Sequence, residues 1–472
     1  MSHRAKEFPM IFTQYYLDCL SQASYLVADE QSRQAVVVDP RRDVEEYLAD
    51  AREQGLTIVG IINTHFHADF VSGHLELAKE TGAWIGYGDA AKAEFEIRSL
   101  ADGERIQLGD PESGVTLQVM TTPGHTPESI SVLVFEHASD ERAYGVLTGD
   151  ALFIGDVGRP DLLASIGVTA DELGRMLHHS IQTKLMGLDD AVRVFPAHGA
   201  GSACGKNLST ERQSTIGEQR RTNYACQPMS EDDFLAVVTE GQPSAPGYFV
   251  YNATINRQER DLRELETEVP GLDYEQFRQE VAVGARIHDA RDPQEFAAGH
   301  FTGAINVPAD GRMAETVGMV FAPTDRIVIV APEGLEQQVA TRIARIGFDH
   351  VVGFLADPEA AMTSHPEDVE QASRLTVDQA ESALADGSVQ IVDIRNAGEV
   401  AAGMIPGARH IPLAELVARQ SDLDRDTPVI VNCAGGWRSS VGASTLRSLG
   451  FTDVSDLLGG YGAWEKAHAA AS

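Results

Sequence analysis

The stretch IINTHFHADFVSGH, residues 61–74, begins at the end of a short apolar run that predicts a strand. Two histidines, an aspartate and a phenylalanine follow it closely. Histidine and aspartate are common metal ligands, and His65, His67 and Asp69 stand close together in the chain. Residues of the same kinds follow the apolar runs VTLQVMTTPG, AYGVLTG and AVRVFPA, and in chain order they are His125, Asp150 and His198. Loops that leave one edge of a sheet can bring such side chains together. The sequence therefore predicts a metal site at a sheet edge.

Length and composition describe a folded chain of several domains. At 472 residues the chain is too long for one ordinary domain, and its 43% hydrophobic and 23% charged residues are typical of folded protein. The formal net charge of −34 would repel nucleic-acid phosphates and acidic membrane surfaces, so we expect neither as a partner. Neither the opening MSHRAKEFPMIF nor any later run has the apolar length of a signal peptide core or a membrane span. We therefore expect a cytoplasmic protein, and the sequence is compatible with a homo-oligomer.

The organisation of the chain changes near residue 245. Before it, short apolar runs alternate with helical stretches, and EGQPSAPGYF, residues 240–249, reads as a linker. After it, IHDARDPQEFAAGHFTGAINVP (287–308) and IVDIRNAGEVAAGMIPGARHIP (391–412) share Asp, Arg, Glu, two Gly and Pro at one constant offset. The expected domains are residues 1–245, 270–365 and 373–472, the last two being copies of one α/β module.

Together, THFHAD, TTPGHTPES, TGDALF and PAHG resemble the metallo-β-lactamase fold family, in the order that family uses. The resemblance covers about the first 230 residues and implies an αβ/βα sandwich with a metal site at one edge. In the two-metal members, the first site takes the residues that match His65, His67 and His125. The second takes those that match Asp69, the residue after it, and His198, and the match of Asp150 bridges the two metals.

Phe70 stands where the second metal site would take a histidine. A phenyl ring has no lone pair for a metal, so we expect one metal rather than two. Two histidines and one carboxylate with open positions form the facial triad that suits non-haem Fe(II) and oxygen chemistry. The spacing leaves open which histidine of the HxH pair binds. The resemblance to the persulfide dioxygenase branch of the fold implies His65, with His125 and Asp150, and one Fe(II) per chain.

The remaining candidates surround this site, either as substrate-binding residues or as supports of the ligands; they are His67, Asp69, His198, Arg159 and Cys204. GRPD places Arg159 and Asp161 just after Asp150, as in the dioxygenases, where this segment lies near the thiol substrate. Arg159 could pair with a carboxylate or phosphate of that thiol, or tie its own loop to Asp161. Cys204, in HGAGSACGKN, could relay sulfur near the metal or be a structural loop cysteine.

The C-terminal repeat resembles the rhodanese family, in which a strand delivers a cysteine into a tight loop before a helix. In PVIVNCAGGWRSS, Cys433 opens the loop, and loop amides, the helix N-terminus and Arg438 would stabilise its thiolate beside an anionic sulfur donor. The first copy, IVIVAPEGLEQQ, has Val330 or Ala331 at the matching place and no cysteine in its loop. We interpret it as a scaffold or docking module without thiolate chemistry.

The whole chain thus resembles a persulfide dioxygenase fused to an inactive and then an active rhodanese. This implies oxidation of a low-molecular-weight thiol persulfide by dioxygen to sulfite, with Cys433 passing sulfur to sulfite to give thiosulfate, or running in reverse. The resemblance thus implies clearance of persulfide derived from sulfide. One alternative is a zinc hydrolase of the glyoxalase II kind that activates water on a thioester. A non-catalytic sulfur carrier or sensor is the other, and it would require a vestigial metal site.

Overall fold

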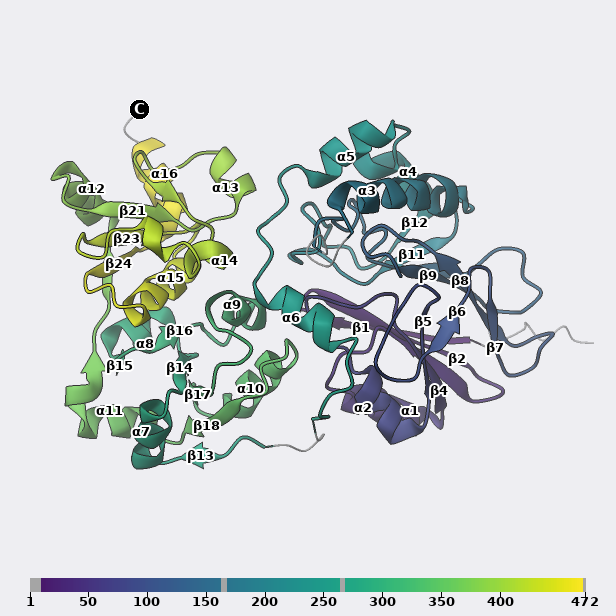
Figure 1. Cartoon of the computed structure of the whole chain (residues 1–472), viewed down its shortest axis with the longest axis horizontal. Helices are drawn as coiled ribbons and strands as arrows, with labels where there is room; N and C mark the ends of the chain where they lie inside the picture. The colour runs from purple at the N-terminus through teal and green to yellow at the C-terminus, as the bar shows by residue number, and fades with distance from the viewer. Residues whose placement is uncertain (1–9, 163–167, 264–267, 470–472) are drawn as a thin grey trace, which may run out of the picture. The chain divides into compact units, whose positions relative to one another are not determined.

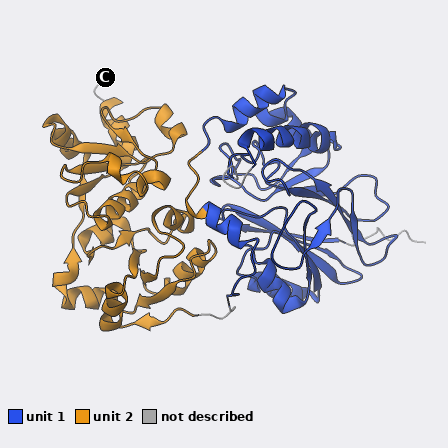
Figure 2. Ribbon diagram, in the orientation of Figure 1, with its two compact units in different colours: residues 1–242, 249–266 blue, residues 243–248, 267–472 orange. Residues whose placement is uncertain are grey.

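The computed structural model describes residues 10–162, 168–263 and 268–469 (Figure 1). The chain divides into two compact units, residues 1–242 with 249–266 and residues 243–248 with 267–472 (Figure 2). Among the described residues, no helix combines the length and apolarity that crossing a membrane requires.

The first unit is built on two sheets, each of six strands among the described residues. The first sheet contains, in spatial order, β1 (Met10–Leu17), β2 (Gln22–Asp29), β3 (Gln34–Val38), β4 (Thr57–Ile62), β5 (Trp84–Gly88) and β6 (Arg98–Leu100). The second contains β12 (Ser214–Thr215), β11 (Arg193–Pro196), β10 (Gly145–Gly149), β9 (Ile130–Phe135), β8 (Val115–Thr121) and β7 (Arg105–Leu108).

Alternating side chains explain why these strands are buried on both faces. Along β2, Tyr25 and Val27 pack between the two sheets, whereas Leu26 and Ala28 pack on the opposite face, toward the helices. That outer face is covered by α1 (Glu45–Gln54) and α2 (His74–Thr81). The second sheet packs in the same way against α3 (Ala170–His179), α4 (Ile216–Thr222) and α5 (Glu231–Thr239). The layers are helix, sheet, sheet and helix, which confirms the predicted αβ/βα sandwich (Figure 1).

The second unit repeats one parallel sheet. The first copy has the strand order β13 (Gly271–Leu272), β18 (Val351–Leu355), β17 (Ile327–Val330), β14 (Arg286–Asp289) and β16 (Ile305–Asn306). The second copy has the equivalent order β20 (Ser373–Leu375), β24 (Val454–Leu457), β23 (Val429–Asn432), β21 (Gln390–Asp393) and β22 (Arg409–His410). A short ladder joins β15 (His300–Phe301) to β19 (Val369–Glu370). The two predicted α/β modules are therefore present.

Helices connect these strands in both copies. Those of the first copy are α7 (Tyr274–Ala282), α8 (Pro293–Ala298), α9 (Met313–Val320), α10 (Glu336–Ala344) and α11 (Pro358–Ser364). Those of the second are α12 (Val377–Ala385), α13 (Ala397–Ala401), α14 (Leu413–Leu416), α15 (Trp437–Ser448) and α16 (Gly460–Ala469).

The residues shared by the two repeats make the same buried clamp. Arg395 donates from Nε to Asp393 Oδ1 at 2.9 Å and from Nη2 to the carbonyl of Gly403 at 2.7 Å. In the first copy Arg291 makes the matching bonds to Asp289 at 3.0 Å and to the carbonyl of Gly299 at 3.0 Å. A buried arginine requires such partners. Asp, Arg and Gly therefore recur because they hold the strand to the loop that follows it.

Candidate functional site

The predicted metal ligands converge at one edge of the sandwich. His65 follows β4, His125 follows β8 and Asp150 follows β10, and their potential ligand atoms lie within 4.8 Å of one another. Asp150 Oδ2 is 3.9 Å from His65 Nε2 and 3.5 Å from His125 Nε2. All three side chains are buried. Burial and the neighbouring His67 lower the pKa of His65 well below its usual value, which keeps the imidazole neutral and able to bind a metal.

Hydrogen bonds orient both imidazole rings toward Asp150. His125 Nδ1 donates to the carbonyl of Arg159 at 2.9 Å, so its Nε2 carries the lone pair. Thr64 donates its hydroxyl to Asp39 Oδ2 at 2.9 Å and can therefore only accept from His65 Nδ1, also at 2.9 Å. The Nε2 lone pair of His65 is left for a ligand position in the same way.

The third potential ligand atom of this group is a carboxylate oxygen, Oδ2 of Asp150. Asp150 Oδ2 is buried and makes no hydrogen bond within the part of the chain that the structure describes. A buried anionic oxygen without a partner is costly, and here it faces two imidazole lone pairs. These three residues therefore fit a metal ion, with two nitrogens and one oxygen as ligands.

His67 lies beside this group but faces elsewhere. Its Nε2 is 2.9 Å from Asp39 Oδ1, and its ring centroid lies 4.3 Å from that of Phe70, which is fully buried, with the two rings tilted by 34°. Asp39 also accepts from the backbone amide of Thr64 at 2.7 Å. Our sequence reasoning missed Asp39, although it follows the strand QAVVV as the other site residues follow theirs.

A second buried cluster adjoins the first. His198 bridges two carboxylates, with Nδ1 2.8 Å from Asp150 Oδ1 and Nε2 2.7 Å from Asp69 Oδ2. Burial alone would lower the pKa of His198, but Asp150 and Asp69 raise it well above its usual value. Cys204 lies in the same cluster with Asp69 and His198. Burial, then Asp69 and Asp150, raise the pKa of the Cys204 thiol well above its usual value.

Arg159 is tied into its own loop. It donates to both carboxylate oxygens of Asp161 at 2.7 Å, and its side chain is buried. The side chain of Arg159 therefore pairs with Asp161 within its own loop, which was one of the two predicted alternatives. Its backbone carbonyl contacts the candidate metal ligands, because it accepts a hydrogen bond from His125.

A segment that follows α6 (Tyr248–Ile255) supports the HxHxD loop. The side chain of Asn256 donates to the carbonyls of His67 at 2.8 Å and Phe70 at 2.9 Å, and it accepts from the amide of Ser72 at 2.9 Å. Our sequence reasoning missed Asn256, because a lone asparagine far along the chain carries no local signal.

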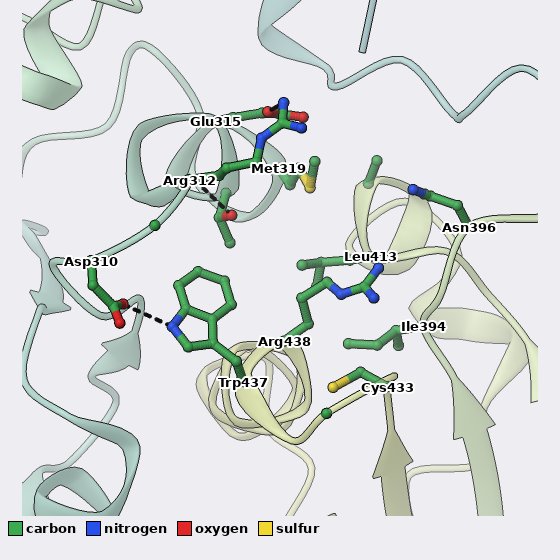
Figure 3. A pocket seen from close by; sticks show the side chains of 14 residues that line it. Asp310, Arg312, Glu315, Met319, Ile394, Asn396, Leu413, Cys433, Trp437 and Arg438 are labelled. Atoms are coloured by element: carbon green, nitrogen blue, oxygen red, sulfur yellow. Dashed lines mark hydrogen bonds and ion pairs between the residues drawn. The ribbon is translucent and has the colours of Figure 1, made fainter. Parts of the chain in front are cut away.

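The second candidate site lies at the end of β23. Cys433 follows this strand, and the amide of Gly436 donates to its sulfur at 3.1 Å. Gly436 has a φ of 94°, which a glycine adopts without strain, and helix α15 begins at the next residue. Arg438 forms a bidentate pair with Glu399 at 2.7 and 2.8 Å and lines the same pocket as Cys433 (Figure 3). In the first copy Ala331 directly follows β17, at the place of Cys433.

Models of two protein families match different parts of the chain. The metallo-β-lactamase superfamily model matches residues 17–198, and the rhodanese-like domain model matches residues 273–357 and 376–467. A metallo-β-lactamase structure from Staphylococcus aureus is 31% identical, with a TM-score of 0.65, and the alignment covers 73% of this chain and 98% of that one.

Two curated relatives bear on the chemistry. The mitochondrial persulfide dioxygenase ETHE1 of Bos taurus is 29% identical over 240 residues, which is 50% of this chain and 83% of the relative. A hydroxyacylglutathione hydrolase of Synechococcus sp. is 33% identical over 150 residues, which is 30% of this chain and 56% of the relative.

Proposed function

The chain belongs to the metallo-β-lactamase superfamily and carries two rhodanese-like domains after that fold, and from this premise we propose that it oxidises the outer sulfur of a thiol persulfide. The overall reaction is RSSH + O₂ + H₂O → RSH + SO₃²⁻ + 2H⁺. His65, His125 and Asp150 would hold one Fe(II). A bound Fe(II) with open positions supplies the activation of dioxygen that this oxidation needs.

The observation that carries the proposal is Asp150 Oδ2, which accepts no hydrogen bond from the described residues and faces two oriented imidazoles. Asp39, through Thr64, and the carbonyl of Arg159 keep the protons of His65 and His125 on Nδ1, away from the metal. His198 holds the other oxygen of Asp150 and so orients the carboxylate. Similarity to persulfide dioxygenases over the metal domain supports the same reaction.

The Cys433 site would supply the second activity, sulfur transfer. The thiolate attacks the outer sulfur of a persulfide, the bond between the two persulfide sulfurs breaks, and its electron pair leaves with RS⁻. The resulting Cys433 persulfide passes that sulfur to sulfite, giving thiosulfate and the free thiolate. The Gly436 amide donates a hydrogen bond to the Cys433 sulfur at 3.1 Å and so helps to orient it.

The test of the iron site uses the purified full chain loaded anaerobically with Fe(II). We expect oxygen uptake with glutathione or coenzyme A persulfide and formation of sulfite. Asp150→Ala and His125→Ala should reduce the rate at least a hundredfold because each removes one of three ligands, while far-UV circular dichroism stays unchanged. His137→Ala, in a surface loop away from the three candidate ligands, is the matched control. Activity that requires two bound zinc ions and consumes no oxygen would contradict the proposal.

A zinc hydrolase is the second candidate, and similarity to a hydroxyacylglutathione hydrolase favours it. Phe70 argues against it, because this side chain cannot complete a two-metal site. Hydrolysis of S-lactoylglutathione by the zinc-loaded chain, without oxygen uptake by the iron-loaded chain, would favour the hydrolase.

A further inference from the structure

The first turn of α16 holds the backbone of the Cys433 loop. The amide of Tyr461 donates to the carbonyl of Cys433 at 2.6 Å, and the amide of Gly462 donates to the carbonyl of Ala434 at 3.0 Å. The first amides of a helix have no partner within the helix, and its dipole favours negative partial charge at this end. Two consecutive carbonyls of the loop are therefore fixed toward α16.

This contact requires a glycine at the start of α16. Gly460 is buried and has a φ of 56°, and a Cβ at this position would lie 2.3 Å from the carbonyl oxygen of Cys433. The same Cβ would lie 2.8 Å from the carbonyl oxygen of Ala434. Both oxygens belong to the backbone, so any side chain at residue 460 would push the helix and the loop apart.

The direction of these carbonyls decides where the loop amides point. In a planar trans peptide, the C=O of one residue and the N–H of the next point in opposite directions. Because the carbonyls of Cys433 and Ala434 point toward α16, the amides of Ala434 and Gly435 point away from it. Neither amide donates a hydrogen bond to the residues that the structure describes, and Gly435 lines the same pocket as Cys433. Successive free amides of this kind attract anions.

The first copy offers a comparison within the same chain. Strands β18 and β24 occupy the same place in the two sheets, and the helices that follow them, α11 and α16, begin at Pro358 and Gly460. Proline has a Cβ where the second copy has none. Among the residues described for the first copy, no backbone hydrogen bond joins α11 to the loop that begins at Ala331. The copy without the cysteine therefore also lacks the helix contact.

We propose that Gly460 is a positioning residue of the sulfur-transfer site, because it lets α16 approach the Cys433 loop and direct the amides of Ala434 and Gly435 toward the anionic sulfur donor. This proposal rests on the proposed sulfur transfer at Cys433. With thiosulfate as donor, the thiolate attacks the outer sulfur, the sulfur–sulfur bond breaks, and sulfite leaves with its electron pair. Gly460 takes no part in bond making and acts only through the orientation of the loop peptides.

The test uses the purified full chain, with thiosulfate as donor and cyanide as acceptor. Gly460→Ala places one methyl group against the loop. Gly387→Ala is the matched control, because Gly387 belongs to the same copy, has a φ of 66° and has no described atom within 4 Å of the place of a Cβ. Both variants thus carry similar backbone strain, but only Gly460→Ala disturbs the contact. Far-UV circular dichroism checks that each variant folds.

Two alkylating reagents report the direction of the loop amides. Neutral iodoacetamide and anionic iodoacetate react with the same Cys433 thiolate, so the ratio of their rates does not depend on the fraction of thiolate. Mass spectrometry of the peptide that contains Cys433 separates this reaction from those of the other cysteines. A general loosening of the loop would speed both reagents, whereas amides that turn away would slow iodoacetate relative to iodoacetamide.

Gly460→Ala should lower the ratio of iodoacetate to iodoacetamide rates about threefold or more, and kcat/KM for thiosulfate about tenfold or more, as expected for the loss of a hydrogen bond to a charged group. Gly387→Ala should leave both quantities within about twofold of the parent, because it disturbs no hydrogen bond of the loop. A parental alkylation ratio in folded Gly460→Ala would overturn the proposal.

A second pair of variants decides the question if Gly460→Ala does not fold. Tyr461→Pro removes the amide that donates to Cys433, at a position in the first helical turn that tolerates proline, whereas Tyr461→Ala removes the same ring and keeps the amide. We expect a lower alkylation ratio in Tyr461→Pro than in Tyr461→Ala, and equal ratios would overturn the proposal. If the parent chain transfers no sulfur from thiosulfate to cyanide, the proposed sulfur transfer fails, and the alkylation ratios still test the role of Gly460 separately.

Discussion

Asp150 presents its two carboxylate oxygens to different neighbours, and this division explains the shape of the candidate metal site. Oδ1 faces His198 at 2.8 Å, whereas Oδ2 faces His65 and His125 without a hydrogen bond among the described residues. Burial would raise the pKa of Asp150, but His198 and His65 hold it far below its usual value. The carboxylate is therefore anionic and held in one orientation.

Single residues also show what the sequence could predict. His65, His125, Asp150 and Cys433 each follow the end of a strand, and that position is visible as an apolar run followed within a few residues by the site residue. Asp39 has the same position after β3, yet only the fold reveals that it bonds His67 and Thr64. The sequence does not indicate which residues such an aspartate will contact.

His288 in the first rhodanese copy gives the protein a local sensitivity to acid. It is fully buried in β14, its Nε2 is 2.9 Å from the carbonyl of Val307, and burial lowers its pKa to about 4. In the unfolded chain its pKa would be about 6.5. As the pH falls, the unfolded state binds a proton at this ring before the folded state does. The stability that the neutral ring contributes is therefore fully present above pH 6.5. It is lost as the pH falls toward 4, by roughly 3 kcal/mol in total.

We therefore expect hydrogen exchange in β14 (Arg286–Asp289) to accelerate steeply as the pH falls from 6.5 to 4, after correction for the intrinsic exchange rate. His288→Asn should flatten that dependence, whereas the exposed His350→Gln should leave it unchanged. Equal pH dependence in the parent and His288→Asn would show that this histidine is not responsible.

At the scale of elements, the segment after α6 supports a loop that lies far away in the sequence. Asn256 and His67 are 189 residues apart, and the bonds of Asn256 satisfy three backbone groups of residues 67–72. Contacts over such separations leave no periodic pattern in the sequence. The ends of the strands could be predicted from local patterns, but the support of the HxHxD loop could not.

Replacing this asparagine should weaken both the fold and the metal site. Asn256→Ala leaves buried carbonyls and an amide without partners, at about 1 to 3 kcal/mol for each such group. We expect a loss of at least about 3 kcal/mol in the unfolding free energy, for the three groups together, and a lower iron content after dialysis against a weak chelator. Thr254→Ala, an exposed position of α6, is the control. An iron content equal to that of the parent in a destabilised Asn256→Ala chain would show that the loop holds its geometry without this side chain.

The first rhodanese copy also has one feature that the sequence reveals and one that only the fold reveals. The missing cysteine was visible in the sequence, because neither Val330 nor Ala331 is a cysteine, and the structure places Ala331 where Cys433 stands in the second copy. Its place beside Cys433 was not visible, because the segment from Asp310 to Met319, which lines the pocket of Cys433, resembles any loop followed by a mostly apolar helix. Packing between the two repeats decides this placement, and a pattern within one repeat does not predict it.

At the scale of the whole molecule, covalent linkage would join the two proposed sulfur chemistries in one chain. The metal domain would release sulfite, and the Cys433 persulfide would consume it. A tether converts an encounter of two proteins into an intramolecular one and can raise the effective concentration to the millimolar range. Fusion thus gives a physical reason for sulfite to reach the rhodanese before it diffuses away.

Cys433→Ser should separate these activities. A serine alcohol supplies essentially no oxyanion at neutral pH, so transfer from thiosulfate to cyanide should fall below detection, while oxygen uptake by the iron-loaded chain continues. The variant, given persulfide and oxygen, should accumulate sulfite where the parent forms thiosulfate, and ion chromatography of both anions measures the ratio. Cys226→Ser, which changes a buried thiol of the first unit, serves as the matched control. Thiosulfate formed at the parental rate by Cys433→Ser, with persulfide too dilute to react with sulfite unaided, would move sulfur transfer to the metal domain. Cys204, in the cluster with Asp69 and His198, would then be the thiol to replace next.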